Sequence, residues 1–262
     1  MPKVNKLQRK RPSDTVTKPA GDQRRAPAKG PDMSLPQNIL SKINRMYKHA
    51  ADAEKAVWMK KYMRNQFEFF GIPTPVRKSI NKEVFTMELD LTSTRELLQL
   101  LWKQPEREYQ HCGLDLAGRS VKLLNGSTRG DCIASMECLK TMVVTGSWWD
   151  TVDPLATTIG DLVRLRPQVL NPVVDSWIGD DNMWLRRVAI LHQLKYKSDT
   201  DKDKLFRFCL LCGHEKEFFI QKSIGWALRQ YFRHNPEDVK EFVKKNEDKL
   251  SALSKREALK HA

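Results

Sequence analysis

Residues 217–233 read EFFIQKSIGWALRQYFR and carry a clear helical pattern. Apolar residues recur at the i, i+4, i+7, i+8 and i+11 spacing of one helical face, namely Ile220, Ile224, Ala227, Leu228 and Tyr231. Comparable segments of roughly 12 to 18 residues follow one another from Leu35 onward, separated by Pro, Gly, Asn or Asp. The pattern predicts an all-α fold.

The spacing of these segments also predicts how the helices are arranged. We expect helices to begin near Pro36, Ala51, Pro75, Ser93, Glu106, Arg129, Trp148, Pro167, Asn182, Asp201, Glu217, Pro236 and Ser251. No segment alternates as a strand would, and no heptad pattern persists across the helices. About a dozen short helices with tight turns favour stacked helix pairs over a four-helix bundle.

Charge divides the chain into a tail and a domain. The chain has a net charge of +14 and a pI near 9.6. Residues 1–35 hold nine Lys or Arg against three Asp and no Trp, Tyr or Phe, so we expect a flexible basic tail. The tail is a nuclear-import signal, a phosphate-binding arm or a segment without a role. Residues 36–262 remain basic (14 − 6 = +8) and form the predicted domain.

This charge balance points to a polyanionic partner, a nucleic acid first and an anionic membrane surface second. The sequence shows no apolar run long enough to cross a bilayer and no apolar N-terminal run typical of secretion, so we expect a soluble intracellular protein without membrane association. Five cysteines form an odd set, as expected for reduced thiols in a cytosolic or nuclear compartment.

A tryptophan interrupts the charged side of the helix at 217–233. Trp226 lies roughly 240° from Ile220 at about 100° per residue, among Lys222, Arg229 and Arg233. An indole surrounded by cations suits a DNA-facing surface, because the cations neutralise phosphates while the ring stacks on a sugar or base. The alternative is that Trp226 packs beneath a neighbouring repeat.

The segment SWWDTVD, residues 147–153, combines tryptophans with aspartates. Ser147 and Asp150 have a spacing similar to a capping box, which predicts a helix beginning at Trp148. Trp149 and Asp153 then share one face and offer a ring and a carboxylate to the same small cation. The alternative is that Asp153 only caps a second helix starting at Pro154.

A third irregularity places an arginine in an apolar stripe. Trp184, Val188, Leu191 and Leu194 form one face of the helix predicted over 182–195, and Arg187 lies within it. A buried cation without a partner is costly, so Arg187 should meet a carboxylate or a phosphate. A purely structural ion pair remains equally open.

Other chemistries have little support. Cys209 and Cys212 have a metal-like spacing, but no second pair follows, and we expect core packing. The histidines lack ligand spacing, and neither a phosphate-binding glycine loop nor a GxSxG elbow is present. We therefore expect neither a metal nor a cofactor.

Several motifs together resemble the AlkD family of DNA alkylation repair glycosylases. They are YMRN (62–65) with FGIPTP (70–75), PEREYQ (105–110), SWWDTVD (147–153), DNMWLRR (181–187), LKYK (194–197), KEFFIQKSIGWALR (216–229) and LSKREA (253–258). The resemblance covers nearly everything from about residue 50 onward. It implies HEAT-like helix pairs whose concave basic face holds duplex DNA.

The resemblance also implies roles for individual residues. Asp153, Trp149 and Trp226 match the active cleft, Arg187 the cleft arginine, and Tyr62 a tyrosine close to the DNA. We add further DNA contacts on the matching segments, at Lys222, Arg229, Trp184, Lys195 and Lys197.

The activity implied is excision of cationic alkylated purines (3-methyladenine, 7-methylguanine and bulky N3 or N7 adducts) from duplex DNA by a monomer, without flipping the lesion into a deep pocket. Neutral lesions should be poor substrates. A non-catalytic module that binds distorted or branched DNA is the main alternative. A HEAT-type protein-interaction scaffold is the third, although it does not explain the basic tryptophan face.

Overall fold

The computed structural model describes residues 1–2 and 33–260. One compact unit begins at Ser34 and is separate from residues 1–33. Most of the tail predicted over residues 1–35 lies outside the described residues, so the description below concerns the unit from Ser34 onward.

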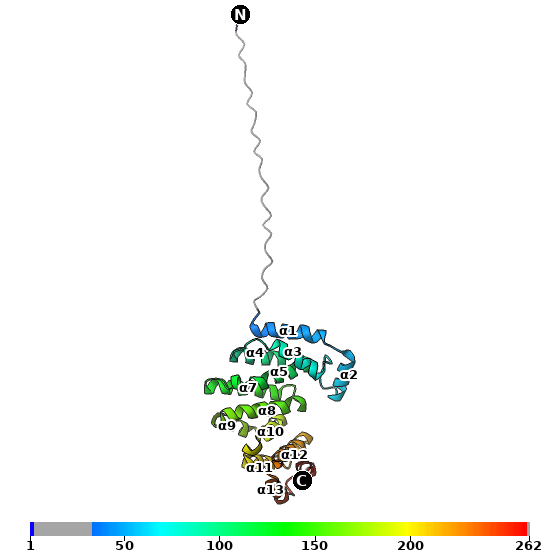
Figure 1. Cartoon of the computed structure of the whole chain (residues 1–262), viewed down its shortest axis with the longest axis vertical. Helices are drawn as coiled ribbons and strands as arrows, with labels where there is room; N and C mark the ends of the chain where they lie inside the picture. Colours follow the sequence, from blue (N-terminus) through cyan, green and yellow to red (C-terminus); the bar gives the residue numbers. More distant parts are fainter. Residues whose placement is uncertain (3–32, 261–262) are drawn as a thin grey trace. The chain divides into compact units, whose positions relative to one another are not determined.

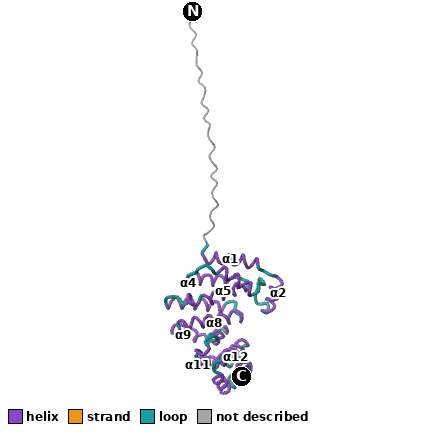
Figure 2. Tube along the Cα trace, viewed as in Figure 1, coloured by secondary structure: helices purple, strands orange, loops and turns teal. Residues whose placement is uncertain are grey.

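This unit is all-helical, as predicted, and Figures 1 and 2 show its helices following one another in chain order. The described residues form no strand, and one isolated bridge joins Glu68 to Glu106. The elements are α1 (Leu35–His49), α2 (Ala53–Tyr62), α3 (Thr74–Val84), α4 (Leu91–Trp102), α5 (Arg107–Arg119), α6 (Val121–Leu124), α7 (Arg129–Val144), α8 (Trp149–Leu165), α9 (Pro167–Trp177), α10 (Met183–Leu191), the 3₁₀ turn η1 (Lys197–Asp199), α11 (Lys202–Leu211), α12 (Phe218–Phe232), α13 (Pro236–Lys245) and α14 (Ala252–Ala258).

Helix starts follow the local signals in the sequence. Every predicted start lies within two residues of an observed one. Ser34 caps α1 in a capping box with Gln37, and Thr128 caps α7 in one with Asp131. Helix α6 was not predicted, because four residues are too few to show a helical period.

Helices pack mainly against helices one to three positions away along the chain, as in a helical-repeat solenoid. Helix α8 contacts α5, α7, α9 and α10, and α12 contacts α10, α11, α13 and α14. Apolar faces meet in one continuous core that runs from Ile39 to Ala258. The face predicted for 217–233 is correct, because all five of its apolar residues are buried.

Two glycines let backbones approach where the helices carrying the candidate site meet. A Cβ at Gly160 of α8 would lie 1.8 Å from the carbonyl oxygen of His192, just after α10. A Cβ at Gly225 of α12 would lie 2.4 Å from the Cβ of Glu257 on α14. Any side chain at either position would separate the two helices.

Two sequence-based expectations about helix ends, and one alternative, were wrong. Helix α8 continues through Pro154, so Asp153 does not cap a second helix, and the Oγ of Ser147 donates to the carbonyl of Val143 rather than capping α8. Helix α10 ends at Leu191 rather than near Lys195. It ends early because the amide side chain of Gln193 both accepts from and donates to the backbone of Asp201, which draws the chain out of the helix.

Among the described residues, no helix is long and apolar enough to cross a membrane.

Candidate functional site

An open pocket of about 350 Å³ lies where α8, α10 and α12 meet. Its lining consists of Trp149, Asp153, Arg187, Phe218, Phe219, Lys222, Trp226 and Arg229. All of these except the two phenylalanines were singled out in the sequence. The fold therefore brings together side chains that lie as many as 80 residues apart, such as Trp149 and Arg229.

Arg187 pairs with Asp153 through two hydrogen bonds. Its Nε donates to Oδ1 at 2.7 Å and its Nη2 to Oδ2 at 2.9 Å, while Nη1 donates to the carbonyl of Phe219. The Arg187 side chain is only 5% exposed. Arg187 thus pairs with a carboxylate, one of the two partners expected for it. Its hydrogen bonds to Asp153 and to the Phe219 carbonyl hold the carboxylate beside the start of α12.

Burial raises the pKa of the Asp153 carboxyl above its ordinary value, and the Arg187 guanidinium opposes that shift. A carboxylate with a raised pKa is a better proton acceptor than a solvated one. The pocket, which is also lined by Trp149 and Trp226, therefore holds a carboxylate of increased basicity.

The tryptophans occupy the positions that the helical spacing predicted. Trp149 and Asp153 lie one turn apart on the same face of α8, and both line the pocket. Trp226 is half-buried, so one part of it packs against the core while another part lines the pocket. The packing expected by one interpretation is thus found for part of the Trp226 side chain, and its contact with DNA stays a prediction.

A carboxylate from α14 pairs with the pocket's other cations. Glu257 accepts from Lys222 at 2.9 Å and from Arg229 at 2.5 Å, and Arg229 also donates to the Glu257 carbonyl. These hydrogen bonds from Lys222 and Arg229 lower the pKa of Glu257 to about 2. The sequence placed Lys222 and Arg229 on a basic face but gave no sign of Glu257, because it lies 28 residues beyond Arg229.

An aromatic cluster supports the pocket from behind. Trp184 is 8% exposed and packs against Phe219 at 5.0 Å and Trp148 at 6.1 Å between ring centroids. Trp184 does not line the pocket. The expectation that it contacts DNA must be revised, because its ring is buried under Phe219 and Trp148.

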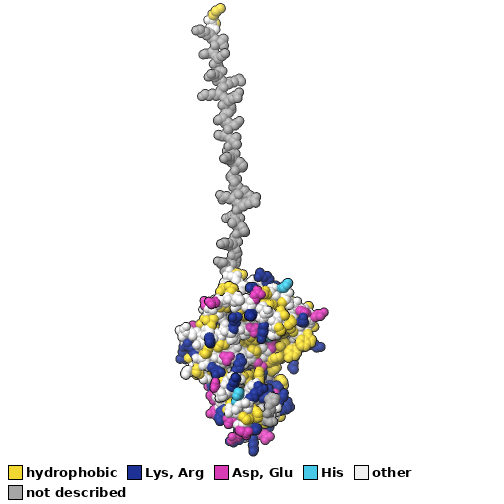
Figure 3. Space-filling view, in the orientation of Figure 1, with side chains coloured by type: hydrophobic (Ala, Val, Ile, Leu, Met, Phe, Trp, Pro, Cys, Tyr) yellow, Lys and Arg dark blue, Asp and Glu magenta, His cyan; other side chains and the backbone are white. Residues whose placement is uncertain are grey.

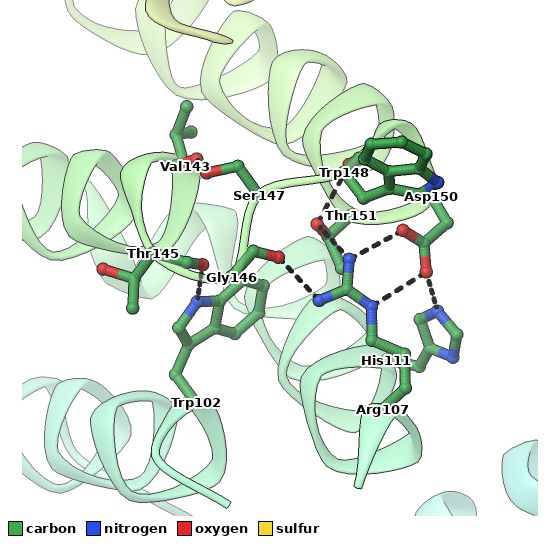
Figure 4. Close-up of polar contacts among 10 residues, drawn as sticks. All are labelled: Trp102, Arg107, His111, Val143, Thr145, Gly146, Ser147, Trp148, Asp150 and Thr151. Atoms are coloured by element: carbon green, nitrogen blue, oxygen red, sulfur yellow. Dashed lines mark hydrogen bonds and ion pairs between the residues drawn. The ribbon is translucent and has the colours of Figure 1, made fainter. Parts of the chain in front are cut away.

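A buried arginine anchors the first turn of α8 (Figure 4). Arg107 of α5 is 1% exposed and donates to Asp150 Oδ1 at 2.7 Å, to Asp150 Oδ2 at 3.0 Å, to the Gly146 carbonyl at 2.7 Å and to Thr151 Oγ1 at 3.0 Å. His111, one turn along α5, lies 2.9 Å from Asp150 Oδ2. These contacts hold the turn from which Trp149 projects.

The charge on Asp150 is stabilised by this cluster. Burial alone raises the pKa of Asp150, but hydrogen bonds from His111 and Arg107 outweigh it and bring that pKa to about 2. Asp150 therefore pairs with α5 rather than capping α8 as its spacing from Ser147 suggested. The sequence alone does not predict the pair of Arg107 and Asp150, because the two residues lie 43 positions apart.

The remaining predicted contacts lie outside the pocket lining. Tyr62, at the end of α2, is 60% exposed, and its ring is nearly perpendicular to that of Trp149, with 6.2 Å between the ring centroids. Lys195 is exposed and lies 3.7 Å from Asp161. Lys197 is exposed in η1. Of these three, Tyr62 alone contacts a residue that lines the pocket.

In the described part of the chain, no three or more His, Cys, Asp or Glu side chains lie close enough together to hold a metal ion. Cys209 and Cys212 are buried in the core, as expected, and burial raises the pKa of both thiols.

The chain matches known proteins over most of its length. Residues 43–262 match the family described as DNA alkylation repair enzyme. A solved structure described as a predicted DNA alkylation repair enzyme from Enterococcus faecalis is similar, with 33% sequence identity and a TM-score of 0.70, covering 80% of this chain and 96% of that one. The alkylpurine DNA glycosylase AlkC of Pseudomonas fluorescens, bound to DNA containing an abasic site analog, matches at 18% identity and a TM-score of 0.47, covering 86% of this chain and 61% of that one. No curated protein matches the chain.

Proposed function

Because the chain belongs to the family of DNA alkylation repair enzymes, we propose that it is a DNA glycosylase that hydrolyses the N-glycosidic bond of cationic alkylated purines in duplex DNA. The observation that carries this proposal is the pocket in which Trp149, Trp226 and Asp153 meet, with the carboxylate oriented by Arg187. The substrates are purines that carry a positive charge after alkylation, such as 3-methyladenine and 7-methylguanine.

Bond cleavage needs no general acid in this site. When the C1′–N bond of a cationic purine breaks, its electron pair moves to the base nitrogen and neutralises the base. The deoxyribose becomes an oxocarbenium ion, and water then adds to C1′ with loss of a proton. The step that needs help is therefore the formation of positive charge on the sugar.

Asp153 supplies that help in the proposed mechanism. Its carboxylate stabilises the developing charge on the sugar and accepts the proton of the attacking water, a role favoured by its raised pKa. Trp149 and Trp226 hold the deoxyribose and add cation–π attraction. Arg187 acts through Asp153, because its side chain is buried and three of its five N–H groups are already used by Asp153 and Phe219.

The surface around the pocket would bind the duplex. Lys222 and Arg229 lie at the pocket itself, and Tyr62 lies beside Trp149. Lys195 and Lys197 are exposed cations further away, which suit contacts with phosphates along the duplex. Together these residues would provide the concave basic face expected for the fold.

The test is single-turnover release of 7-methylguanine from alkylated duplex DNA, comparing the full chain with Asp153→Asn. We expect the rate to fall by about 10²- to 10³-fold, the usual cost of losing a preorganised electrostatic group, while DNA affinity changes little. Asp203→Asn is a matched control, because Asp203 of α11 is exposed, forms no ion pair with another described residue and does not line the pocket.

Each outcome separates the candidate functions. Equal release by the protein and Asp153→Asn would remove Asp153 from the mechanism. Absence of release together with tight, salt-dependent binding would instead support a non-catalytic DNA-binding module. Efficient excision of uracil or a neutral ethenoadduct would contradict the cationic substrate class, because neutral bases need leaving-group activation that the mechanism does not include.

A further inference from the structure

Helix α2 carries three large apolar side chains that are mostly exposed. Val57 is 71% exposed, Trp58 67% and Tyr62 60%, and none of the residues of α2 is buried. Figure 3 shows hydrophobic side chains gathered on the side of the molecule where α2 lies in Figure 1. Exposed apolar side chains that cluster often mark a binding surface, whereas single exposed apolar side chains are common and need no explanation.

The rings on α2 continue the aromatic lining of the pocket. Trp58 and Tyr62 are one turn apart and stack at 5.7 Å between centroids with an interplanar angle of 7°. Tyr62 in turn meets Trp149 edge-on, at 6.2 Å and 78°. An unbroken aromatic row therefore leads from the pocket, through Tyr62, to the outward indole of Trp58.

The charges beside this row are positive and available. Lys55 and Lys60 pair with Asp52 and Glu68, respectively. Lys61 and Arg64 are exposed, and neither forms an ion pair with another described residue. Flat rings next to unpaired cations suit the bases and phosphates of a nucleic acid.

We propose that the Trp58 indole, supported from behind by Tyr62, stacks on a nucleotide of the bound duplex that flanks the alkylated one, while Lys61 and Arg64 bind the adjacent phosphates. The inference rests on the proposed function, because the row begins at the pocket assigned to the lesion. A two-fold contact between copies of the chain through α2 is disfavoured, since it would bring Lys61 and Arg64 of the two copies close together.

The inference is tested with Trp58→Ala, measured for affinity to a duplex containing an abasic-site analogue. We expect the Kd to rise by about 5- to 150-fold, the range for losing one stacked base. Trp58→Phe retains a ring and should keep most of the affinity. Leu211→Ala on α11 is the control, because Leu211 is also half exposed but does not line the pocket, and it should leave the Kd unchanged.

A probe of stacking identifies the nucleotide. 2-Aminopurine is placed in turn at each position flanking the abasic site on both strands. At one position its fluorescence should be quenched when the wild type binds and should be brighter when Trp58→Ala binds. An unchanged Kd in Trp58→Ala, or no position whose emission depends on Trp58, would overturn the inference. So would a wild-type dimer that Trp58→Ala converts to a monomer in light scattering, because the surface would then bind a second copy.

Failure of the proposed function gives a different result. If the wild type releases no 7-methylguanine but Trp58→Ala still weakens duplex binding, the stacking surface stands and the glycosylase assignment fails. If the wild type releases 7-methylguanine normally and Trp58→Ala binds the duplex as the wild type does, the glycosylase assignment stands and the stacking surface fails. The wild type and Trp58→Ala should unfold at the same temperature, since Trp58 buries little of its surface.

Discussion

Arg187 holds both carboxylate oxygens of Asp153, at 2.7 Å through Nε and 2.9 Å through Nη2. A lysine at this position keeps the charge but offers a single ammonium, so it cannot fix the plane of the carboxylate. We expect Arg187→Lys to slow single-turnover excision by up to ~10²-fold with little change in DNA affinity.

The control for this variant lies one residue away. Arg186 makes an equivalent two-point pair with Glu215, at 2.9 and 2.7 Å, but does not line the pocket. Arg186→Lys should therefore lose a similar two-point contact and retain the excision rate. Equal slowing in the two variants would mean that Arg187 acts through stability and not by positioning Asp153.

The pH dependence of excision should report the ionisation of Asp153. The carboxylate is the active form, and burial raises its pKa, so the rate falls as pH decreases through a midpoint above the ordinary aspartate value of about 3.9. The rate is measured from about pH 4 to pH 8, with spontaneous depurination subtracted. In Asp153→Asn the residual rate should not fall in this way at low pH. If it still falls, the ionisation of another group is responsible.

Replacing Glu257 should strengthen electrostatic binding of DNA. Glu257→Gln removes the carboxylate that pairs with Lys222 and Arg229, leaving both cations available to phosphates. The plot of log Kd against log salt should steepen by about 0.9 for each phosphate gained. Glu247→Gln, which alters an exposed pair with Lys255, is the control. An unchanged slope in Glu257→Gln would show that phosphates do not approach these cations.

The close contact of α8 with α10 should be sensitive to a single methyl group. In Gly160→Ala the new Cβ would collide with the backbone of His192, so we expect a loss of about 1 to 3 kcal/mol in unfolding free energy. Gly118→Ala is the matched helical control, because its Cβ would meet only Thr158 Oγ1, at 3.9 Å, and it should be neutral or stabilising by up to about 1 kcal/mol. Urea denaturation compares them, and equal stability would contradict the predicted collision.

Helix positions were largely predictable from the sequence because their signals are local. The Ser34 cap and the prolines at Pro167 and Pro236 act within one turn, and the apolar spacing within 217–233 shows which side is buried. The early end of α10 was not predictable, because it depends on Gln193 reaching the backbone of Asp201 across a turn.

The candidate site was predictable where a residue violated the pattern of its own helix. Trp149 with Asp153, and Arg187 in an apolar stripe, stood out for that reason. Glu257 and Phe219 fit their local patterns, so nothing in the sequence showed that they meet Lys222, Arg229 or Arg187. Trp58 was also missed, because a helical pattern does not reveal whether any neighbour covers the helix.

The lack of a buried face on α2 bears on how DNA recognition can change by mutation. Substitutions on the pocket helices alter packing, as the contacts of Gly160 and Arg187 show, so most of them lower stability. Val57 and Trp58 contribute little to the core, and replacing them costs little folding free energy. Given the proposed role of α2 in DNA binding, selection or engineering can therefore vary α2 to favour different DNA substrates while the helices that hold the carboxylate stay unaltered.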